Sequence, residues 1–297
     1  MEITLAKNSG FCFGVKRAID IALNEAAKND DGKKIFTYGP IIHNEIVIND
    51  LKSKGIEDFT NYKQNYDDEN ILVIIRSHGV GPDVYNNFES NKISYIDATC
   101  PFVKKIHDLV LEYSSSGYEI IIFGDKNHQE IKGTACWAKS NIYIISNIEE
   151  AKNLVLKKDS KYAIFSQTTF DVNTFKNLVE FFTKNGYNLK VFDTICPSTK
   201  LRQEEIFDIS KASDLMLIIG SKSSSNTKKL YNIAKINCDK TYLIENVSDL
   251  EKINFSGVDS IVKKIGIGAG ASAPEKIIQE VYEYVRCKFW TNAWEFF

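Results

Sequence analysis

Two patterns of apolar residues alternate along the chain. Short apolar runs ending in glycine lead to Gly39, Gly124 and Gly220. Runs of this kind are typical of strands buried on both faces of a parallel sheet. Between them lie stretches whose apolar residues recur every three or four positions, as one-sided helices require; they cover residues 15–27, 102–114 and 198–210. The chain therefore predicts an α/β fold.

The same strand and helix pattern occurs three times, with a period of about ninety residues. The run Asp-Ala-Thr-Cys-Pro ending at Pro101 matches Asp-Thr-Ile-Cys-Pro ending at Pro197, and a diverged first copy contains Cys12. We predict three α/β lobes around a pseudo-threefold axis, with the strand ends facing inward. The lobes cover residues 1–97, 98–193 and 194–284, and a C-terminal aromatic tail covers 285–297.

Three of the six cysteines, Cys12, Cys100 and Cys196, occupy the same position in the three copies, just before a predicted helix. Three thiolates near one axis can hold zinc or an iron–sulfur cluster. Spacings of 88 and 96 residues, with no CxxC, disfavour structural zinc. An iron–sulfur cluster with three cysteine ligands is favoured over catalytic zinc. Catalytic zinc remains an alternative. The other cysteines, Cys136, Cys238 and Cys287, are predicted to be structural.

Polar side chains gather where the predicted strands end. His43, His78 and His128 each follow an apolar run. One loop histidine usually has no catalytic role, but three at related positions predict a site. His107 lies inside a predicted helix and is expected to be structural. The third copy offers hydroxyl and amide groups instead, from Ser224, Ser225, Asn226 and Ser272. Together these donors suit a phosphate or diphosphate.

The segment from Ser272 to Glu275 reads as a capping box with proline in the first helical turn. A glycine-rich turn that leads into a helix N-terminus is also an anion site. No Walker-type phosphate loop is present, so a nucleotide is not implied.

Glu130, two residues after His128, is the candidate proton donor. Burial in a polar cavity would raise the pKa of its carboxyl group and let it protonate a leaving oxygen. A salt-bridged surface glutamate is the alternative interpretation.

Composition excludes several classes of protein. The 297 residues are 43% hydrophobic and 26% charged, with a formal charge of −2, which disfavours nucleic acid as the main partner. No apolar stretch reaches eighteen residues, and the first residues lack a secretory pattern. Six widely spaced cysteines do not form a disulfide framework. We expect a soluble protein of a reducing compartment, either a bacterial cytoplasm or, with a transit peptide removed, a plastid-type stroma. The polar run 61–70 is expected to be a surface loop.

Between Gly10 and Pro274 the chain contains the motifs GFCFGV, IIHNE, RSHGV, DATCP, HQEIKGT, SQTT, DTIC with LRQEE, GSKSSSN and GAGASAP. In this set and order it resembles the 4-hydroxy-3-methylbut-2-enyl diphosphate reductase family (IspH/LytB). The resemblance covers nearly the whole chain. It implies a trefoil of three pseudo-threefold-related α/β lobes around a central iron–sulfur cluster.

The resemblance also assigns roles to residues. Cys12, Cys100 and Cys196 would hold one [4Fe–4S] cluster per chain, whose open iron would bind the allylic hydroxyl of the substrate. The diphosphate would be bound by His43, His78, His128, Ser224, Ser225, Asn226 and Ser272, and Thr168 would also bind the substrate. Glu130, Thr168 and His128 would form the catalytic set, with Glu130, helped by Thr168, delivering protons.

The implied reaction removes the hydroxyl of 4-hydroxy-3-methylbut-2-enyl diphosphate as water, with two electrons and two protons. Isopentenyl and dimethylallyl diphosphates result, in the last step of the non-mevalonate isoprenoid route. A ferredoxin- or flavodoxin-type donor would supply the electrons. Two alternatives remain: an iron–sulfur hydro-lyase that needs no reductant, and a metal-containing protein that binds a phosphate ligand without turnover.

The chain departs from the family pattern at three places. Gln129 stands where the family commonly has proline, which is expected to change loop stiffness more than chemistry. Phe13 replaces the usual alanine after the first cysteine. The C-terminal segment CKFWTNAWEFF has no counterpart in the resemblance.

Overall fold

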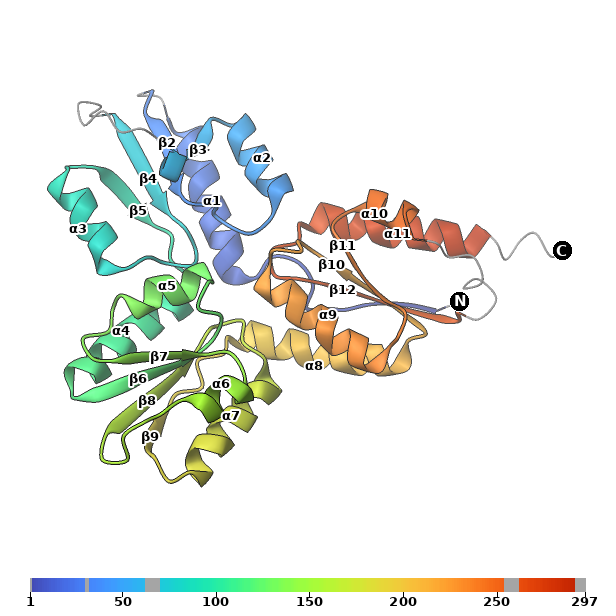
Figure 1. Ribbon diagram of the computed structural model, residues 1–297. Helices are drawn as coiled ribbons and strands as arrows, with labels where there is room; N and C mark the ends of the chain where they lie inside the picture. The colour runs from blue at the N-terminus through green and yellow to red at the C-terminus, as the bar shows by residue number, and fades with distance from the viewer. Residues whose placement is uncertain (1, 30–31, 62–69, 254–261, 292–297) are drawn as a thin grey trace. The chain divides into compact units, whose positions relative to one another are not determined.

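The structure, a computed structural model, describes residues 2–29, 32–61, 70–253 and 262–291 (Figure 1). Within these ranges the strands form three four-stranded sheets in which all neighbours are parallel. The prediction of an α/β fold with three lobes is confirmed. Most of the predicted loop at 61–70 and the end of the predicted tail, 292–297, lie outside the described residues.

The first lobe has the strand order β3-β2-β4-β5. Its strands are β2 (Lys34–Tyr38), β3 (Ile56–Asp58), β4 (Ile71–Ile75) and β5 (Ser94–Asp97). Its helices are α1 (Phe13–Ala27), α2 (Glu45–Ser53), the 3₁₀ helix η1 (Phe59–Asn61) and α3 (Pro82–Ser90).

The second lobe repeats this order as β7-β6-β8-β9. Its strands are β6 (Tyr118–Phe123), β7 (Ile142–Ile145), β8 (Lys161–Ser166) and β9 (Asn188–Val191). Its helices are α4 (Pro101–Ser115), α5 (Gln129–Ala135), α6 (Ile148–Asn153) and α7 (Val172–Lys184). Along β6, Ile120 and Ile122 pack with residues of α4, whereas Ile121 and Phe123 pack with residues of α7. Because successive side chains of a strand point to opposite faces, α4 and α7 cover opposite faces of this sheet.

The third lobe has the order β11-β10-β12-β1. Its strands are β10 (Leu215–Ile219), β11 (Thr241–Ile244), β12 (Lys264–Ala269) and β1 (Glu2–Leu5). Its helices are α8 (Pro197–Ala212), α9 (Ser225–Asn237), α10 (Val247–Glu251) and α11 (Glu275–Thr291). The predicted tail therefore begins inside α11. No helix among the described residues is both long enough and apolar enough to cross a bilayer.

Strand β1 differs from the predicted first lobe, which began at residue 1. It pairs in parallel with β12, with Ile3 opposite Ile265, and so forms the edge of the third lobe's sheet. The residues of a strand do not specify its partner strand. The prediction therefore assigned β1 to the lobe that follows it along the chain. Each cysteine of the repeat now follows the same kind of edge strand: β1, β5 or β9.

The chain divides into two compact units. One contains residues 13–42 and 48–196, and therefore the sheets of the first and second lobes. The other contains residues 1–12, 43–47 and 197–297, with the third sheet.

Candidate functional site

The three repeated cysteines have the same backbone anchor. Each donates its N–H to a carbonyl in the loop that follows an inner strand, either β12, β4 or β8. The pairs are Cys12 with Ala271 (3.3 Å), Cys100 with Ser77 (3.0 Å) and Cys196 with Thr168 (2.9 Å). Each cysteine also directly precedes a helix, α1, α4 or α8. The prediction that they occupy equivalent positions is therefore confirmed.

The loop bonded to Cys100 leads to two histidines. His78 follows Ser77, and its ring lies edge-on to that of His128, with 5.4 Å between the ring centroids. His128 is the N-cap of α5, and its Nδ1 accepts a hydrogen bond from the backbone N–H of Glu130 at 3.2 Å. A neutral His128 that accepts at Nδ1 carries its proton on Nε2.

Glu130 is the buried carboxyl group of this unit, with 2% of its surface exposed. Thr168 donates to both of its oxygens: the backbone N–H to Oε1 at 2.6 Å and the hydroxyl to Oε2 at 2.7 Å. Burial raises the pKa of Glu130 to about 7, against these two hydrogen bonds, which lower it. The group therefore exchanges a proton near neutral pH. The surface salt-bridge interpretation of Glu130 is wrong.

Thr168 connects this carboxyl group to the last cysteine, because the backbone carbonyl of Thr168 accepts a hydrogen bond from the backbone N–H of Cys196. A continuous series of contacts thus links six of the predicted site residues in one unit. These are Cys100, His78, His128, Glu130, Thr168 and Cys196.

The other unit holds the remaining predicted residues. Ser272 follows the carbonyl that anchors Cys12, and its own carbonyl accepts a hydrogen bond from Asn44 Nδ2 at 2.9 Å. The Asn44 Oδ1 atom accepts from Ile46 N and Val47 N at the start of α2. This bonding fixes the segment that carries His43 beside the Ser272 loop.

The predicted capping box at Ser272 is wrong. The carbonyl of Pro274 accepts from Ile278 N at 3.2 Å, so α11 begins after the proline. Ser272 lies too early in the chain to cap this first turn. Its hydroxyl is buried and has no hydrogen-bond partner within the part of the chain that the structure describes. The helix start therefore does not use the hydroxyl of Ser272.

The start of α9 completes this set. Ser224 is its N-cap and accepts from Thr227 N at 3.4 Å. Thr227 packs against Gly220 and Gly270, which follow β10 and β12, so α9 begins beside the ends of both strands. Asn226 is 4% exposed, and neither polar atom of its side chain has a partner among the described residues. Ser225, half-buried, is the first residue of the helix.

The predicted residues thus form two sets, one in each unit. The first unit holds Cys100, Cys196, His78, His128, Glu130 and Thr168, and the second holds Cys12, His43, Ser224, Ser225, Asn226 and Ser272. Within each unit, hydrogen bonds and packing contacts connect these residues or their neighbours in the chain. The convergence of both sets on one centre stays a prediction.

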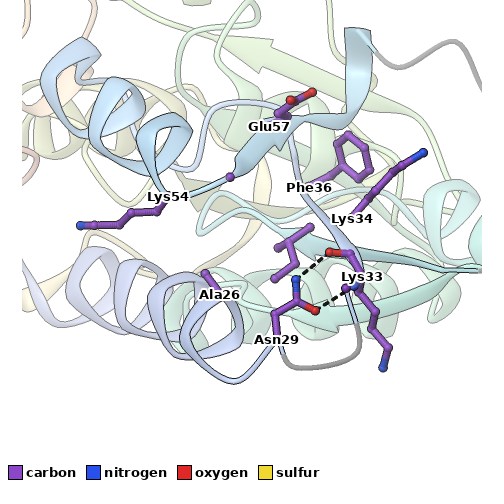
Figure 2. A pocket seen from close by; sticks show the side chains of 10 residues that line it. Ala26, Asn29, Lys33, Lys34, Phe36, Lys54 and Glu57 are labelled. Carbon is purple, nitrogen blue, oxygen red and sulfur yellow. Dashed lines mark hydrogen bonds between the residues drawn. The ribbon is translucent and has the colours of Figure 1, made fainter.

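A cavity of about 470 Å³ lies elsewhere, on the first lobe. Its lining includes Lys33, Lys34 and Lys54, near the starting ends of β2 and β3. The backbone N–H of Cys100 is hydrogen-bonded to the loop after β4. Because β2 and β4 are parallel, that loop lies at the carboxyl ends of the strands, opposite the starting ends where the cavity lies. Figure 2 shows the three ammonium groups pointing in different directions, so they do not converge on a ligand. This cavity is not part of the candidate site.

Comparison with known proteins decides the family. Residues 3–286 match the family described as LytB protein. The chain belongs to the LytB family. Two relatives named 4-hydroxy-3-methylbut-2-enyl diphosphate reductase come from Caldanaerobacter subterraneus subsp. tengcongensis, at 41% identity, and Clostridioides difficile, at 38%. The alignments cover 96% of this chain in both cases, and 97% and 99% of the two relatives.

Solved structures of LytB-type reductases are also similar. The E-1-hydroxy-2-methyl-but-2-enyl-4-diphosphate reductase from Plasmodium falciparum has a TM-score of 0.88 at 29% identity, over 96% of this chain and 88% of that chain. A second structure, described as the terminal enzyme of the non-mevalonate pathway, has a TM-score of 0.68 at 35% identity, over 96% of this chain and 99% of that one. The resemblance found in the sequence is confirmed.

LytB proteins are iron–sulfur enzymes, and the cysteines of this chain fit such a group. All six lie within the described residues and none forms a disulfide. The three repeated ones are half-buried, and each directly precedes a helix, α1, α4 or α8. A side chain on Gly14 of α1 would place its Cβ 2.5 Å from Cys100 Sγ, so only glycine leaves this thiol its space.

Sequence reasoning missed several residues that shape this LytB site. Asn44 was missed although an asparagine before a helix is a recognisable N-cap signal. Gln129 accepts from Arg76 Nη2 at 2.9 Å, and Arg76 Nη1 donates to the carbonyl of Tyr38 at 2.8 Å. Gln129 therefore ties the start of α5 to the end of β4. No local signal predicts this contact, because its residues are 53 positions apart.

Proposed function

We propose that this chain is a 4-hydroxy-3-methylbut-2-enyl diphosphate reductase. It replaces the allylic hydroxyl of its substrate with hydrogen, consumes two electrons and two protons, and releases water with isopentenyl or dimethylallyl diphosphate. The observation that carries this proposal is the position of Glu130. A buried carboxyl group with a pKa of about 7 shares Thr168 with Cys196, so a proton source is held beside a metal-binding thiol.

The electrons require a redox group, and the donor set for it is Cys12, Cys100 and Cys196. We propose that these three thiolates hold one [4Fe–4S] cluster with one iron free of protein ligands. When bound, the cluster supplies the electrons and a Lewis-acidic iron that polarises the C–O bond. The equivalent backbone anchors of the three cysteines support a threefold ligand set.

The diphosphate is bound by two groups of donors. Asn226, Ser272, Ser224, Ser225 and His43 come from one unit, and His78 and His128 from the other. The Asn226 Nδ2 amide and the Ser272 hydroxyl are buried and have no partner in the described part of the chain, and an anion would accept hydrogen bonds from both donors. The N-terminus of α9 adds the positive end of its dipole. Holding the diphosphate fixes the hydroxyl end of the substrate for reaction.

Glu130 supplies the proton for the leaving oxygen. Its proton is retained near neutral pH because burial disfavours the carboxylate. Thr168 holds both oxygens in place, so the carboxyl group is oriented before the substrate arrives. His128 fixes the first turn of α5 through the N–H of Glu130 and so positions the carboxyl group from the other side.

The reductase needs an external electron source, for which we propose a ferredoxin- or flavodoxin-type protein. A hydro-lyase with the same ligand set would remove water without any donor. The two reactions separate in one experiment. Anaerobically prepared holoprotein is incubated with 4-hydroxy-3-methylbut-2-enyl diphosphate, with and without reduced methyl viologen. The proposal predicts isopentenyl and dimethylallyl diphosphates only with the reductant. A dehydrated product formed without it would overturn the proposal in favour of the hydro-lyase.

A further inference from the structure

Two large aromatic side chains are exposed next to the cluster-binding cysteines. Phe13 directly follows Cys12 and is 63% exposed, and Phe102 lies two residues after Cys100 and is 43% exposed. Both belong to the unit that contains α1 and α4. Large exposed aromatics commonly mark protein interaction sites. Phe13 is also one of the three places at which this chain departs from the family pattern.

The first turns of α1 lie against the segment that leads into α4, residues 97–100. Gly14 touches Cys100, and Arg17 donates to the carbonyl of Thr99 at 3.1 Å and to that of Asp97 at 3.4 Å. Phe13 and Phe102 therefore project from two adjoining helix starts. We call these two residues, with Lys16, Lys104 and Lys105, the Phe13 face.

This face is basic. Lys16, Lys104 and Lys105 are exposed in the first two turns of the two helices, and neither helix has an acidic residue in its first turn. The carboxylate of Asp97 pairs with Lys104 at 3.1 Å, and the acids Asp20 and Asp108 lie further along the helices. Lysines around an apolar centre suit an acidic protein, because the charges steer its approach and the aromatics hold it.

We propose that the Phe13 face docks a small acidic one-electron carrier of the ferredoxin type. The inference rests on the proposed function, since only a reductase needs such a partner. A carrier docked here would contact Phe13 and Phe102, which lie one and two positions along the chain from the proposed cluster ligands Cys12 and Cys100. The carrier delivers one electron per encounter, so each turnover requires two encounters. A small, transient interface is expected, as for other redox pairs.

Binding tests this proposal without relying on turnover. The affinity of an acidic two-iron ferredoxin for the holoenzyme is measured at low and high salt by biolayer interferometry. Phe13→Ala is expected to weaken binding by about tenfold, as loss of an interface aromatic does. The double variant Lys16→Glu with Lys105→Glu is expected to lower the association rate by about tenfold at low salt, with the difference vanishing at high salt.

Matched controls come from other surfaces. Val155 is 91% exposed away from these helices, and Lys176 lies on α7, across the sheet from α4. Val155→Ala and Lys176→Glu should bind ferredoxin as the wild type does. All variants should keep their iron and their rate with methyl viologen, which needs no docking surface. If the wild type itself shows no turnover with methyl viologen, the result refutes the proposed function and not the docking face.

Two results would overturn the docking proposal. One is unchanged ferredoxin affinity in both the Phe13→Ala and the double lysine variant. The other is an equal loss in the Val155→Ala and Lys176→Glu controls. A Phe13→Ala change that alters the oligomeric state by light scattering, without altering ferredoxin binding, would assign the face to a second copy of this chain instead.

Discussion

The hydroxyl of Thr168 donates to Glu130 Oε2 at 2.7 Å while its backbone N–H donates to Oε1 at 2.6 Å. One residue therefore holds both oxygens of a buried carboxyl group. The carbonyl of the same residue accepts the N–H of Cys196. The proposed proton donor, Glu130, and the proposed metal ligand, Cys196, are thus both anchored by a single residue of the loop after β8.

The first prediction concerns pH. Burial raises the pKa of Glu130 to about 7, so the fraction that carries a proton falls as pH rises through that value. We expect kcat with methyl viologen to decline above about pH 7, because the ionised group cannot donate. Glu119→Gln should leave this limb unchanged, since Glu119 is a surface carboxylate whose pKa is lowered by a hydrogen bond from Tyr143. A rate that stays flat from pH 6 to 9 would remove Glu130 as the donor.

Thr168→Val tests the hydrogen bond itself. The hydroxyl of Thr168 lowers the pKa of Glu130, so its loss should raise that pKa and move the declining limb of kcat to higher pH. The backbone bonds to Glu130 and Cys196 remain, so iron content should not change. The measurement is a pH–rate profile of both proteins at equal iron content. A limb at the wild-type position would show that Thr168 does not tune the carboxyl group.

Ser272 and Ser224 should separate stability from binding. Ser272→Ala removes a buried hydroxyl without a partner in the described structure, so the free energy of unfolding should be unchanged or rise by about 1 kcal/mol. Ser224→Ala removes the N-cap of α9 and should lower it by about 1 kcal/mol. Both should raise KM for the diphosphate substrate. Urea unfolding and steady-state kinetics measure the two effects, and a stability loss at Ser272 without a KM change would contradict its binding role.

Gly14→Ala tests the space around Cys100. The new Cβ would lie 2.5 Å from Cys100 Sγ, so either α1 or the thiol must move. We expect lower iron occupancy and a weaker visible absorption band. Alanine is the better helix former by about 1 kcal/mol, so the helix itself should not be weakened. Full iron content in Gly14→Ala, with unchanged thermal stability, would show that the contact has no bearing on the cluster site.

The repeat made much of this fold predictable. Three copies of one strand and helix pattern gave three lobes, and cysteines at matching positions have matching anchors. Strand β1 was misplaced, because its pairing with β12 joins residues over 260 positions apart. The order of elements along the chain does not reveal that the first strand completes the last sheet.

The sequence predicted which residues belong to the candidate site but not the contacts that they make. Glu130 was suggested by its position after His128, yet the bonds to Thr168 cross 38 residues and depend on how two loops pack. The predicted capping box at Ser272 was wrong because α11 begins after Pro274, which leaves Ser272 too early in the chain to cap the first turn. Local motifs thus located the polar residues, whereas their hydrogen-bond partners were set by the tertiary structure.

The most direct test of the central claim is iron and acid-labile sulfide analysis of anaerobically prepared protein. The wild type should contain about four irons and four sulfides per chain. Cys12→Ser, Cys100→Ser and Cys196→Ser should each lose most of both, together with the brown colour. Cys136→Ser, Cys238→Ser and Cys287→Ser should retain them, because these three thiols lie outside the repeated positions. One equivalent of zinc without iron, or full iron in any of the first three variants, would contradict the account.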